Sequence, residues 1–243
     1  MNKLGFESFS AFQTHLLEEV EARLRSPLMM LETRTTGAGG GVVSDYLVSV
    51  AQRMRDMTDS AVVEPYERAA ELITGARGRV HVLGGRFSRH VAGMLSGYLS
   101  HLRANVTSLG ALNAESADLL LDMGRKDVLI VFDYRRYQTD VVDFARQAAA
   151  RGVRIVLFTD PWLSPPAVAA EVMFIASVEV DSPYDSLAPA VAQMEALVAH
   201  LVAREKAGIE QRVAELEVLR GRNSITIDTP GPAAPARPGP RKA

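Results

Sequence analysis

Residues 84–89 (Gly-Gly-Arg-Phe-Ser-Arg) combine groups that could hold a small anion. They follow a run typical of a β-strand and open a run typical of a helix. Glycine lets the backbone approach a ligand closely, and a helix N-terminus offers free N–H groups to negative charge. The alternative is a purely structural role: a glycine turn with the serine as helix N-cap and both arginines in solvent. The candidate ligand-binding residues here are Gly84, Gly85, Arg86, Ser88 and Arg89.

Residues 132–138 (Phe-Asp-Tyr-Arg-Arg-Tyr-Gln) form a second polar cluster after another strand-like run. Charged side chains are costly to bury unless they pair or bind something. Asp133 could pair with one of the two arginines, or the segment could recognise an anionic or hydroxylated ligand. Both interpretations stay open. The candidates are Asp133, Arg135, Arg136 and Gln138.

Other catalytic chemistry has little support in the sequence. There is no cysteine, which excludes disulfides, thiolate ligands and cysteine nucleophiles. No histidines and carboxylates fall at metal-ligand spacing, so we predict no metal and no cofactor. Isomerisation needs an acid and a base within reach of adjacent carbons, and only His90 and Glu115 lie near the candidate turns.

The elements that position these turns follow from the alternation of apolar runs and helix-period segments. Five strands are expected, and three are almost entirely apolar at their centres, as in parallel strands buried on both faces. The segments between them are long enough for crossover helices. The pattern predicts an α/β fold with a doubly wound, parallel, five-stranded sheet. The expected strands are 79–83, 105–109, 128–132, 154–158 and 171–175; the expected helices around them are 43–57, 61–74, 88–102, 114–121 and 138–151.

The rest of the chain divides by composition. We expect a helical arm at 1–34, a glycine-rich flexible linker at 35–42, the main domain at 43–222 and a disordered Pro/Ala-rich tail at 223–243. A long C-terminal helical stretch carries an apolar stripe from Leu187 and a second register from Ile209. Core packing is the first explanation for both stripes, and a homodimer seam along the second is the alternative.

The main domain resembles the SIS (sugar isomerase) domain, a flavodoxin-like fold that binds phosphosugars. Its Gly-x-Gly-x-Ser signature is similar to residues 84–88, where Arg86 replaces the second glycine. Its Ser-x-Ser-Gly-x-Thr signature corresponds to residues 133–138, and its Thr-Asp-x-x-x-Ser-Pro turn is matched at 159–165. The resemblance spans roughly residues 43–205.

The second signature has lost all its hydroxyl groups, which in the family hold the sugar phosphate. Asp133, Arg135, Arg136 and Gln138 stand at the two serines, the glycine and the threonine. The arginines still supply anion-binding groups, and the carboxylate could accept from a ligand hydroxyl or amine. We therefore predict a small anionic or sugar-derived ligand.

Residues 3–12 resemble the junction at the end of the helix-turn-helix domain of MurR/RpiR transcription regulators. The arm would then be a remnant of that domain, and most of the DNA-reading helices are not in this sequence. Five acidic residues against four basic ones in 1–34 make a poor phosphate-neutralising surface. We expect contact with DNA only through the mostly absent helix-turn-helix domain.

The resemblance implies an effector-sensing domain that controls DNA binding, not an enzyme. The alternatives are a sugar-phosphate isomerase and a ligand-free dimerisation or adaptor module. We expect a homo-oligomer, either dimer or tetramer. With no signal peptide and no membrane-spanning run in the sequence, we expect a cytoplasmic protein without a membrane partner.

Overall fold

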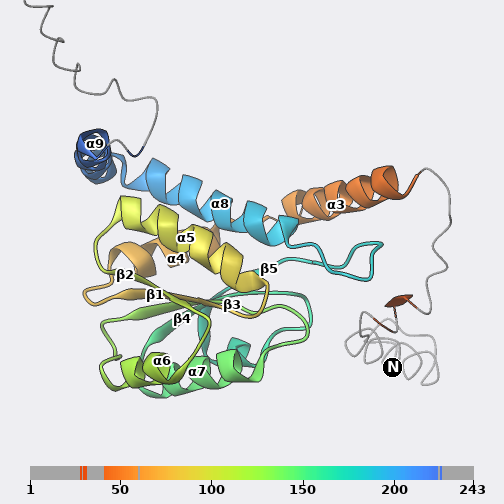
Figure 1. Cartoon of the computed structure of the whole chain (residues 1–243), viewed down its shortest axis with the longest axis horizontal. Helices are drawn as coiled ribbons and strands as arrows, with labels where there is room; N and C mark the ends of the chain where they lie inside the picture. Colours follow the sequence, from red (N-terminus) through yellow and green to blue (C-terminus); the bar gives the residue numbers. More distant parts are fainter. Residues whose placement is uncertain (1–27, 29, 32–40, 60, 224, 226–243) are drawn as a thin grey trace, which may run out of the picture.

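The computed structural model describes residues 28, 30–31, 41–59, 61–223 and 225 (Figure 1). Almost all of the predicted arm and tail, and most of the linker, lie outside these residues, so those assignments stay predictions. The described part contains a five-stranded sheet with the order β2-β1-β3-β4-β5. All neighbouring strands are parallel, which confirms the predicted fold class. The strands are β1 (Val80–Gly84), β2 (Val106–Gly110), β3 (Val128–Phe132), β4 (Arg154–Thr159) and β5 (Ala170–Ile175).

Helices cover both faces of this sheet. On one face lie α4 (Glu64–Thr74), α5 (Ser88–Leu102) and α8 (Ala188–Arg204) (Figure 1). On the other lie α6 (Ala114–Asp118), continued by the 3₁₀ turn η2 (Leu119–Leu121), and α7 (Thr139–Ala150). The strands β1 and β3 are therefore buried along their whole length. This explains why β3 is entirely apolar, whereas β1 also contains the buried His81.

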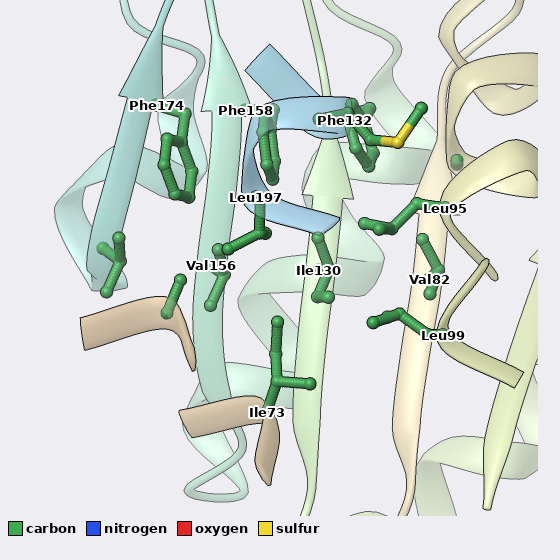
Figure 2. Close-up of a cluster of buried hydrophobic side chains, with 14 of the residues drawn as sticks. Ile73, Val82, Leu95, Leu99, Ile130, Phe132, Val156, Phe158, Phe174 and Leu197 are labelled. Atoms are coloured by element: carbon green, nitrogen blue, oxygen red, sulfur yellow. The ribbon is translucent and has the colours of Figure 1, made fainter. Parts of the chain in front are cut away.

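The core on the α4–α5–α8 face is centred on three stacked aromatic rings (Figure 2). The ring centroids of Phe132 and Phe158 are 4.3 Å apart, and those of Phe158 and Phe174 are 4.4 Å apart. The three rings come from β3, β4 and β5, and they lie near the carboxyl ends of these strands. This packing fixes the strand ends from which the polar turns emerge.

The C-terminal helical stretch is divided in two. α8 ends at Arg204, and α9 (Lys206–Arg222) begins after Glu205, close to the predicted change of register. The first stripe is core, because Met194, Leu197 and Leu201 are buried. The second stripe is mostly not: Ile209 is buried, whereas the positions after it on the helix are partly or largely exposed.

The helix α3 (Val42–Asp59) precedes the sheet and stands apart from it, with no fully buried residue. It contacts the α8 helix and extends beyond the body of the molecule (Figure 1). Arg53 donates from Nε to the backbone oxygen of Glu179, at 2.9 Å, so α3 is also tied to the segment that joins β5 to α8.

Candidate functional site

A cavity of about 420 Å³ lies at the carboxyl ends of the strands, where an open parallel sheet normally binds its ligand. It is built from the turns after β1 and β3 and from the segment between β5 and α8. Met30, upstream of α3, also lines it and is buried. Its lining residues are Met30, Gly85, Arg86, Phe87, Ser88, Asp133, Tyr134, Arg135, Arg136, Gln138, Pro183, Tyr184, Asp185 and Leu187.

The first turn is held against β3 by the hydroxyl of Ser88. It accepts from the backbone N–H of Gly85 at 2.9 Å and donates to the carbonyl oxygen of Phe132 at 2.6 Å. Ser88 is thus the first residue of α5, and its hydroxyl connects two strand ends. It is not the N-cap that the purely structural interpretation of the turn expected. A Cβ on Gly84 would lie 2.6 Å from the Arg89 nitrogen, so the close strand-to-helix turn requires glycine there.

The second turn is fastened to the turn after β4. Asp133 is buried, accepts a hydrogen bond from the Ser164 hydroxyl and lies 3.4 Å from the Gln138 nitrogen. The buried Asp160 accepts from the Tyr137 hydroxyl at 2.7 Å, and from the Arg135 backbone N–H. Asp133 therefore has the Ser164 hydroxyl and the Gln138 backbone N–H as partners, and Arg135 pairs with Asp185. Of the two interpretations left open by the sequence, pairing of Asp133 with Arg135 is not what the structure has.

Burial changes the proton affinity of this cluster. Loss of solvent raises the pKa of Asp133 to about 6, although its hydrogen bonds from Ser164 and Gln138 act in the opposite direction. Burial also raises the pKa of Asp160. Asp133 lines the cavity, so near pH 6 it changes between a carboxylate that accepts and an acid that can donate.

Arg135 faces two carboxylates of the segment between β5 and α8. Its Nε lies 2.9 Å and 3.1 Å from the two carboxylate oxygens of Asp185, and its terminal NH2 also pairs with this group. The carboxylate of Glu179 is 3.9 Å from the other terminal nitrogen. The side chain is only 4% exposed, so this guanidinium is an internal partner of the cavity wall. The hydrogen bond to Asp185 is the main cause of its raised pKa.

Arg136 and Arg86 are exposed residues of the same cavity. Arg136 has a φ of +55°, the left-handed region that side chains with a Cβ rarely adopt. It stands at the glycine of the second SIS signature, which accounts for the family's choice of glycine there. Arg86 lies over the Phe87 ring, 5.2 Å from its centroid. Both side chains line the cavity and are exposed to solvent.

Tyr134 lines the cavity, but its hydroxyl is enclosed in the protein. Its residue is 7% exposed, and among the described residues its hydroxyl has no hydrogen-bond partner. Burial raises its pKa, so it is neutral and can donate or accept. Such a buried unpaired hydroxyl costs free energy unless a bound group satisfies it.

Seven of the nine predicted site residues line one cavity, as the parallel sheet required. Gly84 shapes the turn, and the exposed Arg89 is not among the lining residues. Neither His90 nor Glu115, the candidates for an isomerase, lines it. Sequence reasoning missed the third wall, Pro183 to Leu187. The rule that ligands bind beyond strand ends could have found it, since this segment follows β5.

The described residues contain neither a metal-binding cluster nor a membrane-spanning helix. No group of three or more histidine, aspartate or glutamate side chains could hold a metal ion there. In the same part of the chain, no helix has the length and apolar character needed to cross a membrane.

Comparison with known proteins agrees with this architecture. The SIS domain family matches residues 72–203, more than half of the sequence, and the chain belongs to this family. No curated protein gives a significant match. Among solved structures, the sugar isomerase domain of an RpiR transcription factor from Sphaerobacter thermophilus is similar with a TM-score of 0.69 and 25% identity, over 73% of this chain and 99% of that one.

Two more distant structures share the fold. The NanR protein of Vibrio vulnificus, complexed with ManNAc-6P, has a TM-score of 0.66 and 14% identity, over 93% of this chain and 80% of that one. A candidate sugar-phosphate isomerase from Listeria monocytogenes has a TM-score of 0.57 and 17% identity, over 74% of this chain and 98% of that one. The fold is thus similar both to regulators and to proteins described as isomerases.

Proposed function

We propose that this protein is the effector-sensing domain of a cytoplasmic MurR/RpiR-type transcription regulator. A small anionic carbohydrate derivative binds in the cavity, and attached helix-turn-helix domains read the DNA. The observation that carries the proposal is the composition of the cavity. Exposed Arg86 and Arg136 line the cavity together with the Asp133 carboxyl group. The arginines suit an anionic group, and the carboxyl group suits sugar hydroxyls.

The comparisons support the regulator class and the ligand class separately. The S. thermophilus structure, at 25% identity, is a domain of an RpiR transcription factor. NanR, in a structure with ManNAc-6P, supports a sugar phosphate as the type of ligand. Against catalysis, the single histidine close to the first turn, His90, does not line the cavity.

Thermal unfolding in the presence of sugar phosphates tests the proposal. A ligand that binds the native state raises its stability by mass action, by about 2.7 kcal/mol at a hundred times Kd. We expect ManNAc-6P or another hexosamine or pentose phosphate to raise the Tm, without being converted when the mixture is followed by NMR. Steady conversion of the bound sugar phosphate would instead establish an isomerase.

Arg136→Gly is the variant that tests the cavity. Glycine accepts the positive φ of this position, so we expect the free energy of unfolding to rise by about 1 kcal/mol. The ligand affinity derived from the Tm shift should fall at least tenfold. Leu163→Gly is the matched control, because Leu163 has a φ of +57° and does not line the cavity. Equal ligand affinity in both variants would show that Arg136 does not contribute to ligand binding.

A further inference from the structure

The segment 176–187, which joins β5 to α8, places a carboxylate where a ligand anion would bind. Asp185 meets Arg135 through Nε, at 2.9 Å and 3.1 Å, and through a terminal nitrogen. A guanidinium that offers two parallel N–H groups is the geometry that recognises a carboxylate or a phosphate. Both residues line the cavity, and the arginine side chain is 4% exposed.

The same segment connects the cavity to the helices outside it. Two residues after Asp185, Leu187 lines the cavity and immediately precedes α8. At its other end the backbone oxygen of Glu179 accepts from Arg53 of α3, while its carboxylate faces Arg135 at 3.9 Å. Within the segment, the Ser186 nitrogen donates to the Val178 oxygen at 2.8 Å. The segment that carries Asp185 is thus hydrogen-bonded to α3 at one end and continuous with α8 at the other.

We infer that Asp185 is an internal competitor of the ligand's anionic group for Arg135, and that its displacement transmits binding to α3 and α8. The inference rests on the proposed function for the identity of the ligand, but the competition itself concerns any phosphate. An anion that pairs with Arg135 brings a second negative charge against the Asp185 carboxylate. The two cannot share one guanidinium in the same bidentate geometry, so the carboxylate leaves and the segment is released.

Competition also sets how strongly an anion must attract Arg135 in order to bind. Every anion that displaces Asp185 uses the same free energy to break the internal ion pair, so its binding is weaker by the same factor. A dianionic phosphate attracts Arg135 more strongly than a single carboxylate does, so it overcomes this cost at a lower concentration than a simple acid does.

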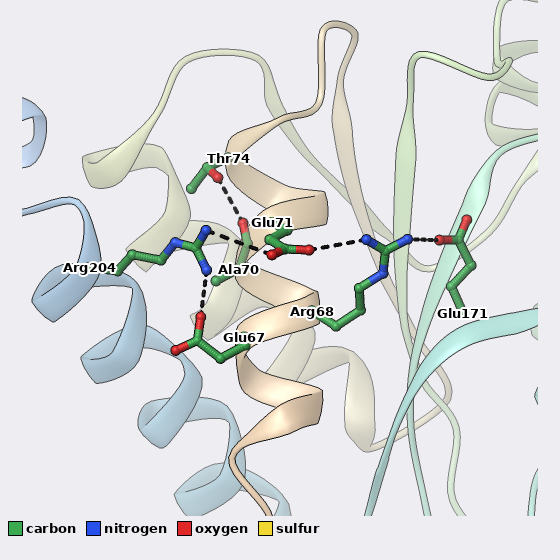
Figure 3. Close-up of polar contacts among 7 residues, drawn as sticks. All are labelled: Glu67, Arg68, Ala70, Glu71, Thr74, Glu171 and Arg204. Carbon is green, nitrogen blue, oxygen red and sulfur yellow. Dashed lines mark hydrogen bonds and ion pairs between the residues drawn. The ribbon is translucent and has the colours of Figure 1, made fainter.

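Calorimetric titration with inorganic phosphate at pH 7.5 measures the competition. We expect Asp185→Asn, which keeps the shape of the side chain, to bind phosphate at least tenfold more tightly than the unaltered protein. Acetate should gain by a similar factor, because both anions are released from the same competitor. Glu171→Gln is the matched control, because it removes a carboxylate that pairs with Arg68 near the start of β5, at the other end of the sheet (Figure 3). Its phosphate affinity should not change.

Hydrogen exchange of residues 176–187 separates competition from a general loss of negative charge. Without phosphate, the amides of this segment should exchange several-fold faster in Asp185→Asn and in Arg135→Gln than in the unaltered protein. Phosphate should accelerate the exchange in the unaltered protein and have little further effect in Asp185→Asn. Asp185→Ala serves as the second variant if the asparagine variant does not fold.

The results distinguish this inference from the proposed function. If sugar phosphates bind but Asp185→Asn leaves phosphate affinity and segment exchange unchanged, the competition is refuted and the proposed function stands. If Asp185→Asn binds phosphate tightly while no sugar phosphate binds any variant, the competition stands and the ligand class is refuted. If phosphate binds neither form, the competition is refuted, and the sugar-phosphate experiment alone decides the proposed function.

Discussion

The protonation state of Asp133 affects both the cavity that it lines and the free energy of unfolding. In the family signature a serine stands here, and in this protein its replacement is a buried carboxyl group that accepts from Ser164. As the pH rises, a group whose pKa is higher in the folded than in the unfolded chain loses its proton later in the folded state. Raising the pH from about 4 to about 6 therefore removes stability, because the unfolded chain ionises first and the buried carboxylate must then form at a cost.

Asp133→Asn should abolish this dependence. A pKa of about 6 in place of 3.8 corresponds to about 3 kcal/mol, present as a penalty above pH 6 and absent below pH 4. Relative to the unaltered protein, the variant should gain stability as the pH rises through this window. Urea unfolding at pH 4, 5, 6 and 7 measures the difference, and Asp143→Asn, on the exposed side of α7, serves as control. A difference that is constant with pH would show that Asp133 has an ordinary pKa.

Single residues also show where sequence reasoning stopped. The two signature turns could be predicted, because their residue types and positions after apolar runs mark them as strand-end turns. The partners of their charged groups could not. Asp185 is 50 residues from Arg135, and no local periodicity indicates that a side chain of the segment before α8 reaches the turn after β3. The arginines adjacent to Asp133 were its nearest candidate partners in the sequence, but in the structure Asp133 accepts from Ser164 and Arg135 pairs with Asp185.

At the scale of elements, the strand-to-helix turn after β1 depends on the absence of a side chain at Gly84. An added Cβ would lie 2.6 Å from the backbone nitrogen of Arg89, which no flexible side chain can relieve. Gly84→Ala must therefore displace the start of α5, together with the Ser88 cross-link to β3. We expect a loss of about 3 kcal/mol or more in the free energy of unfolding, as for other backbone clashes in a packed core, and loss of ligand binding.

Gly93→Ala is the matched control in the same helix. No atom lies within 4 Å of the Cβ that it would add, and Gly93 lies in the middle of α5. Alanine should there raise the free energy of unfolding by about 0.5–1 kcal/mol, because glycine has the lower helix propensity. Chemical denaturation of both variants makes the comparison. If both alanines have the same effect, the close approach at Gly84 is not what shapes the turn.

The elements were also the level at which sequence predictions were most successful. Each predicted strand is present within about two residues. The runs of β3 and β4 are buried on both faces and have few alternative explanations, whereas β2 and β5 at the edges are partly exposed. The segment 114–121 was expected as one helix and instead tightens into the 3₁₀ turn η2. The difference is local geometry at a helix end, which side-chain periodicity does not encode.

For the whole molecule, the apolar residues left exposed on α9 bear on the predicted homo-oligomer. Val213 and Leu219 are 36% and 53% exposed, and Leu216 between them is partly exposed. Arg212, which donates to the Ser100 oxygen at 3.0 Å, lies between Leu216 and Leu219 on the same face of the helix, so the body of the molecule covers this face only in part. A second copy of the chain would bury the exposed residues, and apolar area is the main driving force of such association.

The variant Val213→Glu/Leu219→Glu tests this arrangement. Four like charges, two from each copy, would face one another across the seam, so we expect the protein to become monomeric or to dissociate at least a hundredfold more readily. Light scattering after size exclusion, or sedimentation equilibrium, measures the mass. Val168→Glu is the control: Val168 is 97% exposed in the 3₁₀ turn η3 (Pro165–Ala169), on a different element from the seam. An oligomer of unchanged mass in the α9 variant would show that the copies associate through another surface. The next surface to alter would then be α3, where Val43 and Leu47 are exposed.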